Sequence, residues 1–459
     1  MLPRIAAFLR QHQIPHTYRD LAPRQFPPPV TEGLGDFRAG QRKALETIWN
    51  SEFGQIWAPT AFGKTELTIK LVKSYPTLKI LVVTPFAETV RQLRKRFADH
   101  GVDAGIVDGQ HHKVQRVTIC SAMSLMKVAG PDWDLVLYDE VHKSAAPSSR
   151  QALAACTRAK LFGLTASGEG RADNAEIVVE ALFGPVICQV EYEEAVKAGN
   201  ILPIVVLMLD TTGHDTDVKD PGAKSRHLVW RNSQRNAIIS QAADMVSKLG
   251  QTLVITTVLE HALRLRRRLP GWPVVYGTAP KAHMRDDMTA AEFRAASRAK
   301  LLREFMDKLG VPVLNDKDKG ELSDKFCSGE IRAAISTMTW STGVDFPQLQ
   351  FVIRADAATS EIASTQVPGR GGRLHDTKKC GILIDTEDEF DRTLDNRKKS
   401  RIRVYREKRW TILRHIRLEE LTRICEGLIS HGPSFATDWM LQTARTRSHG
   451  SATLPLASQ

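Results

Sequence analysis

Short apolar runs recur along the chain, separated by stretches long enough to form amphipathic helices. They fall into two series: residues 55–57, 80–84, 117–120, 135–138 and 161–164, and then residues 252–255, 273–276, 333–337, 351–353 and 381–384. Unbroken apolar strands that alternate with helices are typical of parallel sheets covered on both faces. The pattern therefore predicts an α/β protein with two parallel-sheet domains in tandem.

Changes in composition suggest where these domains begin and end. The stretch "QFPPPV" at 25–30 sets a short N-terminal piece apart, and a polar stretch containing Gly and Pro separates the two series. After residue 390 the apolar strands stop. We expect an N-terminal accessory segment (1–32), a first domain (33–210), a linker (211–227), a second domain (228–390) and a basic helical C-terminal extension (391–459).

The chain of 459 residues carries a formal net charge of +12 at pH 7. Surplus Lys and Arg attract polyanions, and nucleic acid is the commonest of these in a cytoplasm. Residues 391–417 hold eleven Lys or Arg against three acids, with Tyr405 and Trp410 among them. Basic residues interleaved with aromatics suit phosphate contact and base stacking, so we expect a second grip on nucleic acid there. The alternative is a helix whose apolar residues dock on the second domain.

Other features of composition limit where the protein works. The six cysteines contain no Cys-x-x-Cys pair, which fits a reducing cytoplasm and argues against a structural zinc site. No apolar run approaches the roughly 18 residues of a membrane helix, and the N-terminal apolar stretch is too short for a signal peptide. We expect a cytoplasmic protein without a membrane partner.

The stretch "WAPTAFGKTEL" at 57–67 joins the end of a predicted strand to the start of a predicted helix through a loop. In that setting backbone N–H groups and the helix N-terminus face phosphates, Lys64 adds positive charge and the Thr65 hydroxyl ligates Mg²⁺. Ala58 replaces the first glycine of the strict pattern, which is tolerable because only the backbone must fit there. The expected phosphate-binding residues are Pro59, Thr60, Ala61, Phe62, Gly63, Lys64 and Thr65.

Asp139 and Glu140 follow the apolar run at 135–138, within "LYDEVH". Acids at the carboxyl end of a parallel strand lie at the edge of the sheet where nucleotides bind. We expect Asp139 to hold Mg²⁺ through water and Glu140 to accept a proton from the attacking water.

Taken in order, these motifs resemble those of the superfamily 2 helicases and translocases of the DExH group, closest to DNA helicases of the phage and repair-type DEVH kind. The resemblance covers residues 33–390 and implies two RecA-like domains. "FRAGQ" resembles the adenine-recognition element, which assigns Arg38 and Gln41 to the nucleotide. "QVPGRGGR" resembles the motif Gln-x-x-Gly-Arg-x-x-Arg, which assigns Gln366, Arg370 and Arg373 to catalysis as stabilisers of phosphate charge.

Further stretches resemble motifs that touch nucleic acid or couple hydrolysis to movement. "GLTAS" at 163–167 resembles the coupling motif with Ser167 in place of threonine, and relatives use the histidine at the position of His142 to link nucleotide state to other motifs. The stretch 326–347 resembles motif V, which assigns Gly343 and Asp345 to the nucleotide. The residues assigned to nucleic-acid contact are Thr84, Pro85, Ser121, Thr256 and Thr337.

The resemblance implies an ATP- and Mg²⁺-dependent DNA helicase that couples hydrolysis to translocation and to strand separation or branched-DNA remodelling. Its partner would be single-stranded, forked or branched DNA in a bacterial or phage-infected host cytoplasm. Three alternatives stay open: a double-strand DNA translocase without unwinding, a DEAH-like RNA helicase, and a binding protein that uses ATP only as a switch. Residues 279–325 are predicted to be a family-specific insertion, with either a docked surface helix or a strand-contacting element at 291–309.

Overall fold

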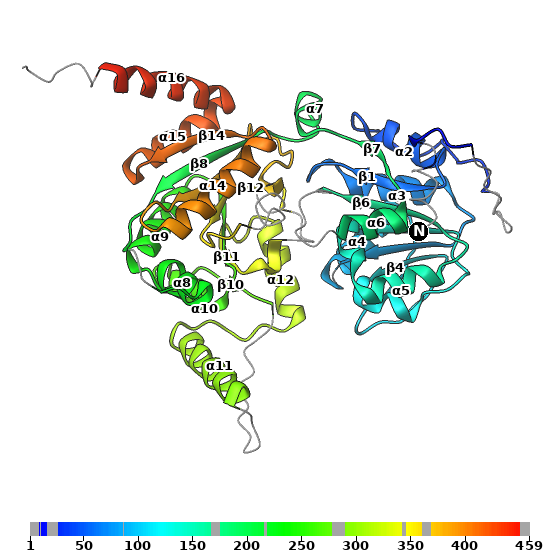
Figure 1. The fold of residues 1–459 in the computed structure, drawn as a ribbon, viewed down its shortest axis with the longest axis horizontal. Coiled ribbons are helices and arrows are strands. Elements are labelled where there is room, and N and C mark those ends of the chain that lie inside the picture. Colours follow the sequence, from blue (N-terminus) through cyan, green and yellow to red (C-terminus); the bar gives the residue numbers. More distant parts are fainter. Residues whose placement is uncertain are drawn as a thin grey trace, which may run out of the picture. The chain divides into compact units, whose positions relative to one another are not determined.

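The computed structural model describes residues 9, 11–15, 26–85, 87–166, 175–214, 218–277, 290–341, 346–359 and 369–449. The chain forms two compact units, Met1–Ile201 and Leu202–Gln459. Within the described residues each unit is built on a parallel sheet of seven strands (Figure 1). The predicted fold class, an α/β protein with two parallel-sheet domains in tandem, is confirmed. No described helix is both long enough and apolar enough to cross a membrane.

The strands of the first sheet lie in the order β3-β4-β2-β5-β6-β1-β7 among the described residues. They are β1 (Phe53–Trp57), β2 (Ile80–Thr84), β3 (Gly105–Val107), β4 (Val117–Ser121), β5 (Leu135–Asp139), β6 (Lys160–Thr165) and β7 (Val186–Gln189). The helices of this unit are α2 (Gln41–Trp49), α3 (Lys64–Ser74), α4 (Ala87–Asp99), η1 (Ala122–Lys127), η2 (Val141–Ala145), α5 (Pro147–Ala155), α6 (Ala175–Phe183) and α7 (Tyr192–Lys197).

The apolar runs exist because each central strand of the first sheet is buried on both faces. In β2, Ile80 and Val82 enter one core cluster together with residues of α2 and α3. Leu81 and Val83 enter the opposite cluster with residues of α5 and α6. Since successive side chains of a strand point to opposite faces, burial of both faces requires an unbroken apolar run.

The second sheet has the order β10-β11-β9-β12-β13-β8-β14 among the described residues. Its strands are β8 (Ile204–Asp210), β9 (Gln251–Ile255), β10 (Val274–Val275), β11 (Ala333–Ser336), β12 (Leu349–Arg354), β13 (Gly381–Glu387) and β14 (Thr411–Ile416). Its helices are α8 (Pro221–Ser225), η3 (Arg226–Trp230), α9 (Ser233–Ser247), α10 (Leu259–Arg266), α11 (Ala290–Lys308), α12 (Asp316–Cys327), η4 (Met338–Ser341), α14 (Arg392–Glu407), α15 (Leu418–His431) and α16 (Pro433–His449).

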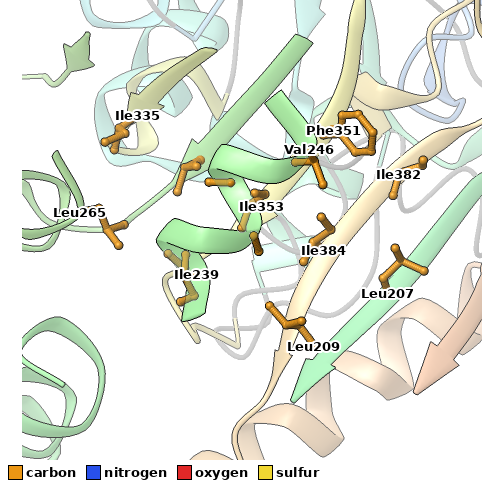
Figure 2. Packing of buried hydrophobic residues seen from close by; sticks show 14 of the residues in the cluster. Leu207, Leu209, Ile239, Val246, Leu265, Ile335, Phe351, Ile353, Ile382 and Ile384 are labelled. Atoms are coloured by element: carbon orange, nitrogen blue, oxygen red, sulfur yellow. The ribbon is translucent and has the colours of Figure 1, made fainter. Parts of the chain in front are cut away.

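Helix α9 contributes to the largest core of the second unit. Figure 2 shows Ile239 and Val246 of this helix in the same buried cluster as Leu207, Ile353 and Ile384 of the sheet. Each of these side chains is almost completely removed from water, which is worth about 1.5–3 kcal/mol for a side chain of this size. The core therefore fixes the centre of the sheet, and the carboxyl ends of its strands carry the polar residues described below.

The boundary between the units differs from the expected one. The first unit ends at Ile201, and β8 pairs in parallel with β13 from Ile204 to Asp210. The residues expected to end the first domain at 210 thus form an inner strand of the second sheet. The expected linker at 211–227 is also part of the second unit, because Lys224 of α8 forms an ion pair of 2.9 Å with Asp391.

The prediction that the strands end at residue 390 is wrong. β14 pairs in parallel with β8 and forms an edge of the second sheet. Residues of α15 and α16 join the same core cluster as Leu413 and Ile416 of β14. The segment 391–459 therefore contributes a strand and helices to the second unit and is not merely a helical extension.

Helix α11 forms within the stretch predicted at 291–309, and one of its faces packs on the second unit. Met306 is buried, and Leu302 and Phe305 pack against the core. The spacing of Phe293, Leu301, Leu302, Phe305 and Leu309 predicts a single apolar face, but Leu301 is 66% exposed; the side chain of Phe293 lies outside the described residues. These contacts favour the docked helix over the strand-contacting element.

Candidate nucleotide site and the residues around it

The loop between β1 and α3 begins as an extension of the sheet. The backbone N–H of Ala58 donates to the carbonyl of Thr165 at 3.0 Å, and the Ala58 side chain is buried. The loop then passes through two left-handed residues, Ala61 with φ of 72° and Gly63 with φ of 94°. A Cβ at Gly63 would lie 2.6 Å from Nε2 of Gln41, so this position requires glycine for both conformation and space.

Lys64 begins helix α3, and the N–H groups in the first turn of a helix point out of its end, where they can bind an anion. The Nζ of Lys64 donates to the carbonyl of Ala58 at 3.0 Å and to that of Pro59 at 3.5 Å. These contacts hold the ammonium group across the loop. Thr65 lies in the first turn, directly after Lys64. The strand–loop–helix setting expected for a phosphate loop is thus present.

Arg38 and Gln41 contact the end of this loop. The Nε2 of Gln41 donates to the carbonyls of Phe62 at 3.1 Å and Gly63 at 3.4 Å. Its Oε1 accepts from the backbone N–H of Arg38 at 3.1 Å, and Nη1 of Arg38 donates to the carbonyl of Ala61 at 3.4 Å. Gln41 is almost fully buried. The amide therefore braces the loop, and its role in reading a base stays a prediction.

Asp139 ends β5, and Glu140 follows in a left-handed conformation with φ of 54°. Burial and the neighbouring Glu140 charge raise the pKa of Asp139, whereas the Lys64 ammonium lowers it. The acidic pair and the loop lysine are therefore close enough to interact. The Asp139 carboxylate and the Thr65 hydroxyl are hard oxygen donors of the kind that Mg²⁺ prefers, and a bound dication would favour the charged form of Asp139. These residues fit a magnesium site.

His142 links the acidic pair to the neighbouring strand. Its Nδ1 lies 3.2 Å from Oγ1 of Thr165 and 3.4 Å from Oε2 of Glu140. The Thr165 hydroxyl also donates to Oε2 of Glu140 at 3.4 Å. The three groups form a triangle at the carboxyl ends of β5 and β6, in which His142 and Thr165 are buried and Glu140 is partly exposed. Sequence reasoning singled out Ser167, which lies outside the described residues, and missed Thr165, the hydroxyl at the end of the "GLT" strand.

The arginine motif of the second unit is described from Gly369 onward; Gln366, Gly343 and Asp345 lie outside the described residues. Arg370 is largely buried, and the N–H of Arg373 donates to the carbonyl of Arg370 at 3.2 Å. A Cβ on Gly381 of β13 would lie 2.5 Å from the backbone of Gly371. Lys378 donates to the carbonyl of Arg373 at 3.0 Å. The turn is thus packed directly on the start of β13.

The residues expected to contact nucleic acid lie at or directly after the carboxyl ends of strands. Thr84 and Ser121 are paired in register at the ends of β2 and β4, with Pro85 directly after β2. The N–H of Thr256, directly after β9, donates to the carbonyl of Ser336 at 2.9 Å. Ser336 is the last residue of β11, and Thr337 follows it. The side chains of Thr84, Ser121, Thr256 and Thr337 are buried. Contact with nucleic acid at these positions remains a prediction.

The expected stacking of bases on Tyr405 and Trp410 is wrong. Tyr405 is fully buried and Trp410 nearly so, and their rings stack on each other with centroids 5.6 Å apart. Several cations of the segment 391–417 also serve the fold: Arg401 is buried against Asp385. The docking alternative accounts for these residues.

Glu387, Glu389 and His415 place three ligand atoms within 4.8 Å of one another at the end of β13. Arg414 donates to both carboxylate oxygens of Glu387, at 2.6 and 2.7 Å. Lys398 forms ion pairs with Glu387 at 3.2 Å and Glu389 at 2.5 Å. Since these cations already neutralise the carboxylates, we assign no metal ion to the cluster.

Two family models match the chain. Residues 35–169 match the type III restriction enzyme res subunit, and residues 297–375 match the helicase conserved C-terminal domain. The first match spans the phosphate loop, the acidic pair and Thr165. The second begins within α11 and ends after the arginine motif.

Similar proteins share both units. The chain is 23% identical over 395 residues to "DNA 3'-5' translocase XPB2" of Sulfurisphaera tokodaii, covering 81% of this chain and 87% of that protein. It is 24% identical to "DNA 3'-5' helicase XPB" of Kineococcus radiotolerans over 70% of this chain, and spans 54% of that longer protein.

Solved structures share the fold. S. cerevisiae Dbp5 bound to RNA and ADP BeF3 superimposes with a TM-score of 0.59 at 11% identity, covering 86% of this chain and 93% of that chain. Mycobacterium smegmatis helicase Lhr bound to ssDNA and AMP-PNP gives 0.54 at 16% identity, covering 82% and 48%. Both sheets are thus RecA-like. With the phosphate loop, the acidic pair and the two matched family models, the chain is an ATP-dependent helicase or translocase, and in sequence it is similar to the XPB-type DNA 3'-5' helicases of superfamily 2.

Proposed function

We propose that this protein is an ATP-driven DNA motor that moves 3'→5' along one strand and separates duplex or remodels branched DNA. The observation that carries the proposal is the triangle formed by Glu140, His142 and Thr165. It joins the expected proton acceptor to a neighbouring strand end, beside a phosphate loop of the required form. A protein that used ATP only as a binding switch would have no need to connect the proton acceptor Glu140 to a neighbouring strand through His142 and Thr165.

We assign the roles within the reaction as follows. Lys64 and the first N–H groups of α3 bind the phosphates, and Asp139 with Thr65 would hold Mg²⁺, which would supply positive charge to neutralise the phosphates. Glu140 accepts a proton from the water that attacks the γ-phosphate as the bond to ADP breaks. Arg370 and Arg373 supply positive charge to the transferred phosphoryl group, a contribution on the order of 10³–10⁵ in rate for such arginines.

We propose DNA as the track because the relatives named above are a DNA translocase and a DNA helicase. The net charge of +12 supports binding to a polyanion. We also propose that the acidic motif, Asp139 to His142, is of the DEVH kind. An RNA substrate is the second candidate, since Dbp5, a neighbour in fold, is bound to RNA.

The test is an ATPase assay with single-stranded DNA, forked DNA, a Holliday junction, plain duplex and RNA, each at the same nucleotide concentration. We expect DNA to stimulate hydrolysis more than RNA, and Glu140→Gln to lower the rate of hydrolysis by about 10²–10⁴ on every substrate. Stimulation by RNA alone would reject the DNA assignment. Hydrolysis indifferent to all five nucleic acids would reject a motor altogether.

Strand separation needs its own assay, because the relatives include a translocase as well as a helicase. Forked duplexes that carry only a 3' or only a 5' tail report unwinding and its direction, and displacement of a triplex-forming strand reports translocation on duplex. We expect unwinding from the 3' tail. Triplex displacement without unwinding of either fork would identify a double-strand translocase instead.

A further inference from the structure

A group of buried charged side chains lies at the carboxyl ends of β12 and β13, and none of them belongs to the nucleotide site. Arg354, Asp385, Arg401 and Tyr405 are each at most 1% exposed. Arg354 ends β12, Asp385 lies in β13, and Arg401 and Tyr405 come from α14. Burying charges is costly unless they are paired, so each member must be held by its partners.

Tyr405 joins the two strand ends. Its hydroxyl donates to Oδ2 of Asp385 at 2.8 Å and accepts from Nη1 of Arg354 at 3.1 Å. The same carboxylate oxygen accepts from Nε of Arg401 at 2.7 Å. Burial raises the pKa of Tyr405, so the hydroxyl stays protonated and remains a donor to Asp385. Helix α14 therefore contacts Arg354 through one hydroxyl group.

Arg354 in turn holds the residues that follow β12. Its Nε and Nη2 each donate to the Asp356 carboxylate at 3.1 Å, and Nη2 donates to the carbonyl of Ala358 at 2.9 Å. Ala357, between them, has φ of 52°, a left-handed conformation that alanine rarely adopts. From the other side, Arg235 of α9 donates to the carbonyl of Ala355 at 2.7 Å. The turn 355–358 is thus held in an unfavourable shape by side chains.

This turn precedes the arginine motif in the chain. On the other side of the motif, Arg373 is held by Lys378, and Gly371 packs on Gly381 at the start of β13. The turn thus lies at the carboxyl end of β12, whereas the motif packs at the opposite, amino end of β13, a strand in which Ile382 and Ile384 pair with Phe351 and Ile353 of β12. Tyr405 and Arg401 of α14 hold the carboxyl ends of both strands through Arg354 and Asp385.

We propose that Tyr405 is a positioning residue for ATP hydrolysis, which sets the turn 355–358 through Arg354 and thereby the place of Arg370. The inference rests on the proposed role of Arg370 in hydrolysis. The competing view is that the buried group only stabilises the second unit. The two views differ in what loss of the Tyr405 hydroxyl does to turnover.

The experiment compares Tyr405→Phe with Tyr276→Phe in the full chain. Tyr276 is a matched control because it is also buried in the second unit, and its hydroxyl makes two hydrogen bonds, to Pro312 at 2.9 Å and from Leu314 at 3.1 Å. Both variants lose one buried hydroxyl, so both are expected to lower the thermal midpoint by roughly 2–8 °C. Only Tyr405→Phe is expected to lower kcat, by about 10- to 100-fold, with KM for ATP nearly unchanged.

A double variant separates this inference from the proposed function. If Tyr405 acts through Arg370, adding Tyr405→Phe to Arg370→Ala lowers kcat no further. Arg354→Lys, which keeps the charge but loses the planar fork that holds Asp356 and Ala358, is expected to behave like Tyr405→Phe.

The inference is overturned if Tyr405→Phe and Tyr276→Phe have the same kcat, or if Tyr405→Phe acts equally in the Arg370→Ala background. A separate result, full activity of Arg370→Ala alone, would instead remove the role proposed for the arginine motif.

Discussion

Replacing Arg235 by methionine removes a cation from the interior of the second unit. Arg235 and Asp388 are both fully buried, with Nε and Oδ1 2.8 Å apart. Arg235 also donates to Thr386 at 2.9 Å and to the carbonyl of Ala355 at 2.7 Å. Methionine fills a similar volume but leaves the Asp388 carboxylate to the weaker hydroxyl donors of Thr211 and Thr386.

The loss can be sized from the pKa of Asp388. Burial alone would raise this pKa, but the charge and hydrogen bonds of Arg235 outweigh burial and lower it from 3.8 to about 2. That difference corresponds to about 2 kcal/mol of stability. Because the lost cation also leaves a buried charge without its counterion, we expect Arg235→Met to lower the free energy of unfolding by about 3–5 kcal/mol at pH 7.

The pH dependence has a definite sign. In the unmodified protein the folded-state pKa of Asp388 lies below the unfolded value of 3.8. Its stabilisation is therefore fully present above about pH 4 and is lost as pH falls through about 2. In Arg235→Met, burial without the cation raises the pKa of Asp388, so the folded state gains from protonation. The difference between the two proteins is expected to narrow as pH is lowered from 7 toward 4.

Hydrogen exchange of peptides from β12 and β13 measures the opening of the second unit separately from the first. Lys248→Met is the matched control, since it breaks an ion pair of 2.7 Å with Asp244 in which the side chains are 70% and 56% exposed. Exposed pairs contribute about 0–1 kcal/mol. If Arg235→Met costs no more than Lys248→Met, the reasoning about the buried pair is refuted.

Three further predictions concern the nucleotide site and the C-terminal segment. Lys64→Ala should weaken ATP binding about 10- to 100-fold in a titration, whereas Glu140→Gln should bind ATP normally and lose about 10²–10⁴ in kcat; equal loss of binding in both would contradict these roles. His142→Ala should retain ATP binding, but the stimulation of its ATPase activity by DNA should fall at least about fivefold. An unchanged stimulation ratio would show that the triangle does not couple hydrolysis to DNA binding. Truncation after residue 390 should unfold the second unit, seen as loss of exchange protection in β8, because β14 and the partners of Asp385 and Glu387 are removed; a cooperatively folded truncated protein would disprove this.

The sequence predicted strands best where a strand is buried on both faces of the sheet. β2 and β5 were predicted because a central parallel strand must be apolar throughout. β14 was missed because it is an edge strand in which the polar Arg414 and His415 interrupt the apolar run. β8 was not predicted as a strand, and its residues were placed in the first domain, because the strands with which it pairs, β13 and β14, come much later in the chain.

In the candidate site, too, residues in local motifs were predicted, whereas contacts that depend on distant parts of the chain were not. Lys64, Asp139 and Glu140 were found because short local patterns carry their chemistry. Thr165 was missed because its contact with Glu140 depends on the pairing of β5 with β6. The charge of the 391–417 segment was misread for a similar reason: composition counts Arg401 as a free cation, whereas its partner Asp385 is supplied by another strand.

The position of β8 has a consequence for how the chain is made. β8 ends at residue 210 and lies between β13 and β14, and β14 ends at residue 416. At about 5–20 residues per second, this strand emerges from the ribosome roughly 10–40 s before both of its partners exist. The first unit, Met1–Ile201, draws all its described strands from residues already synthesised by then. During that interval the apolar stretch "IVVLML" has two unpaired strand edges. We therefore expect the second unit, rather than the first, to need chaperones during synthesis.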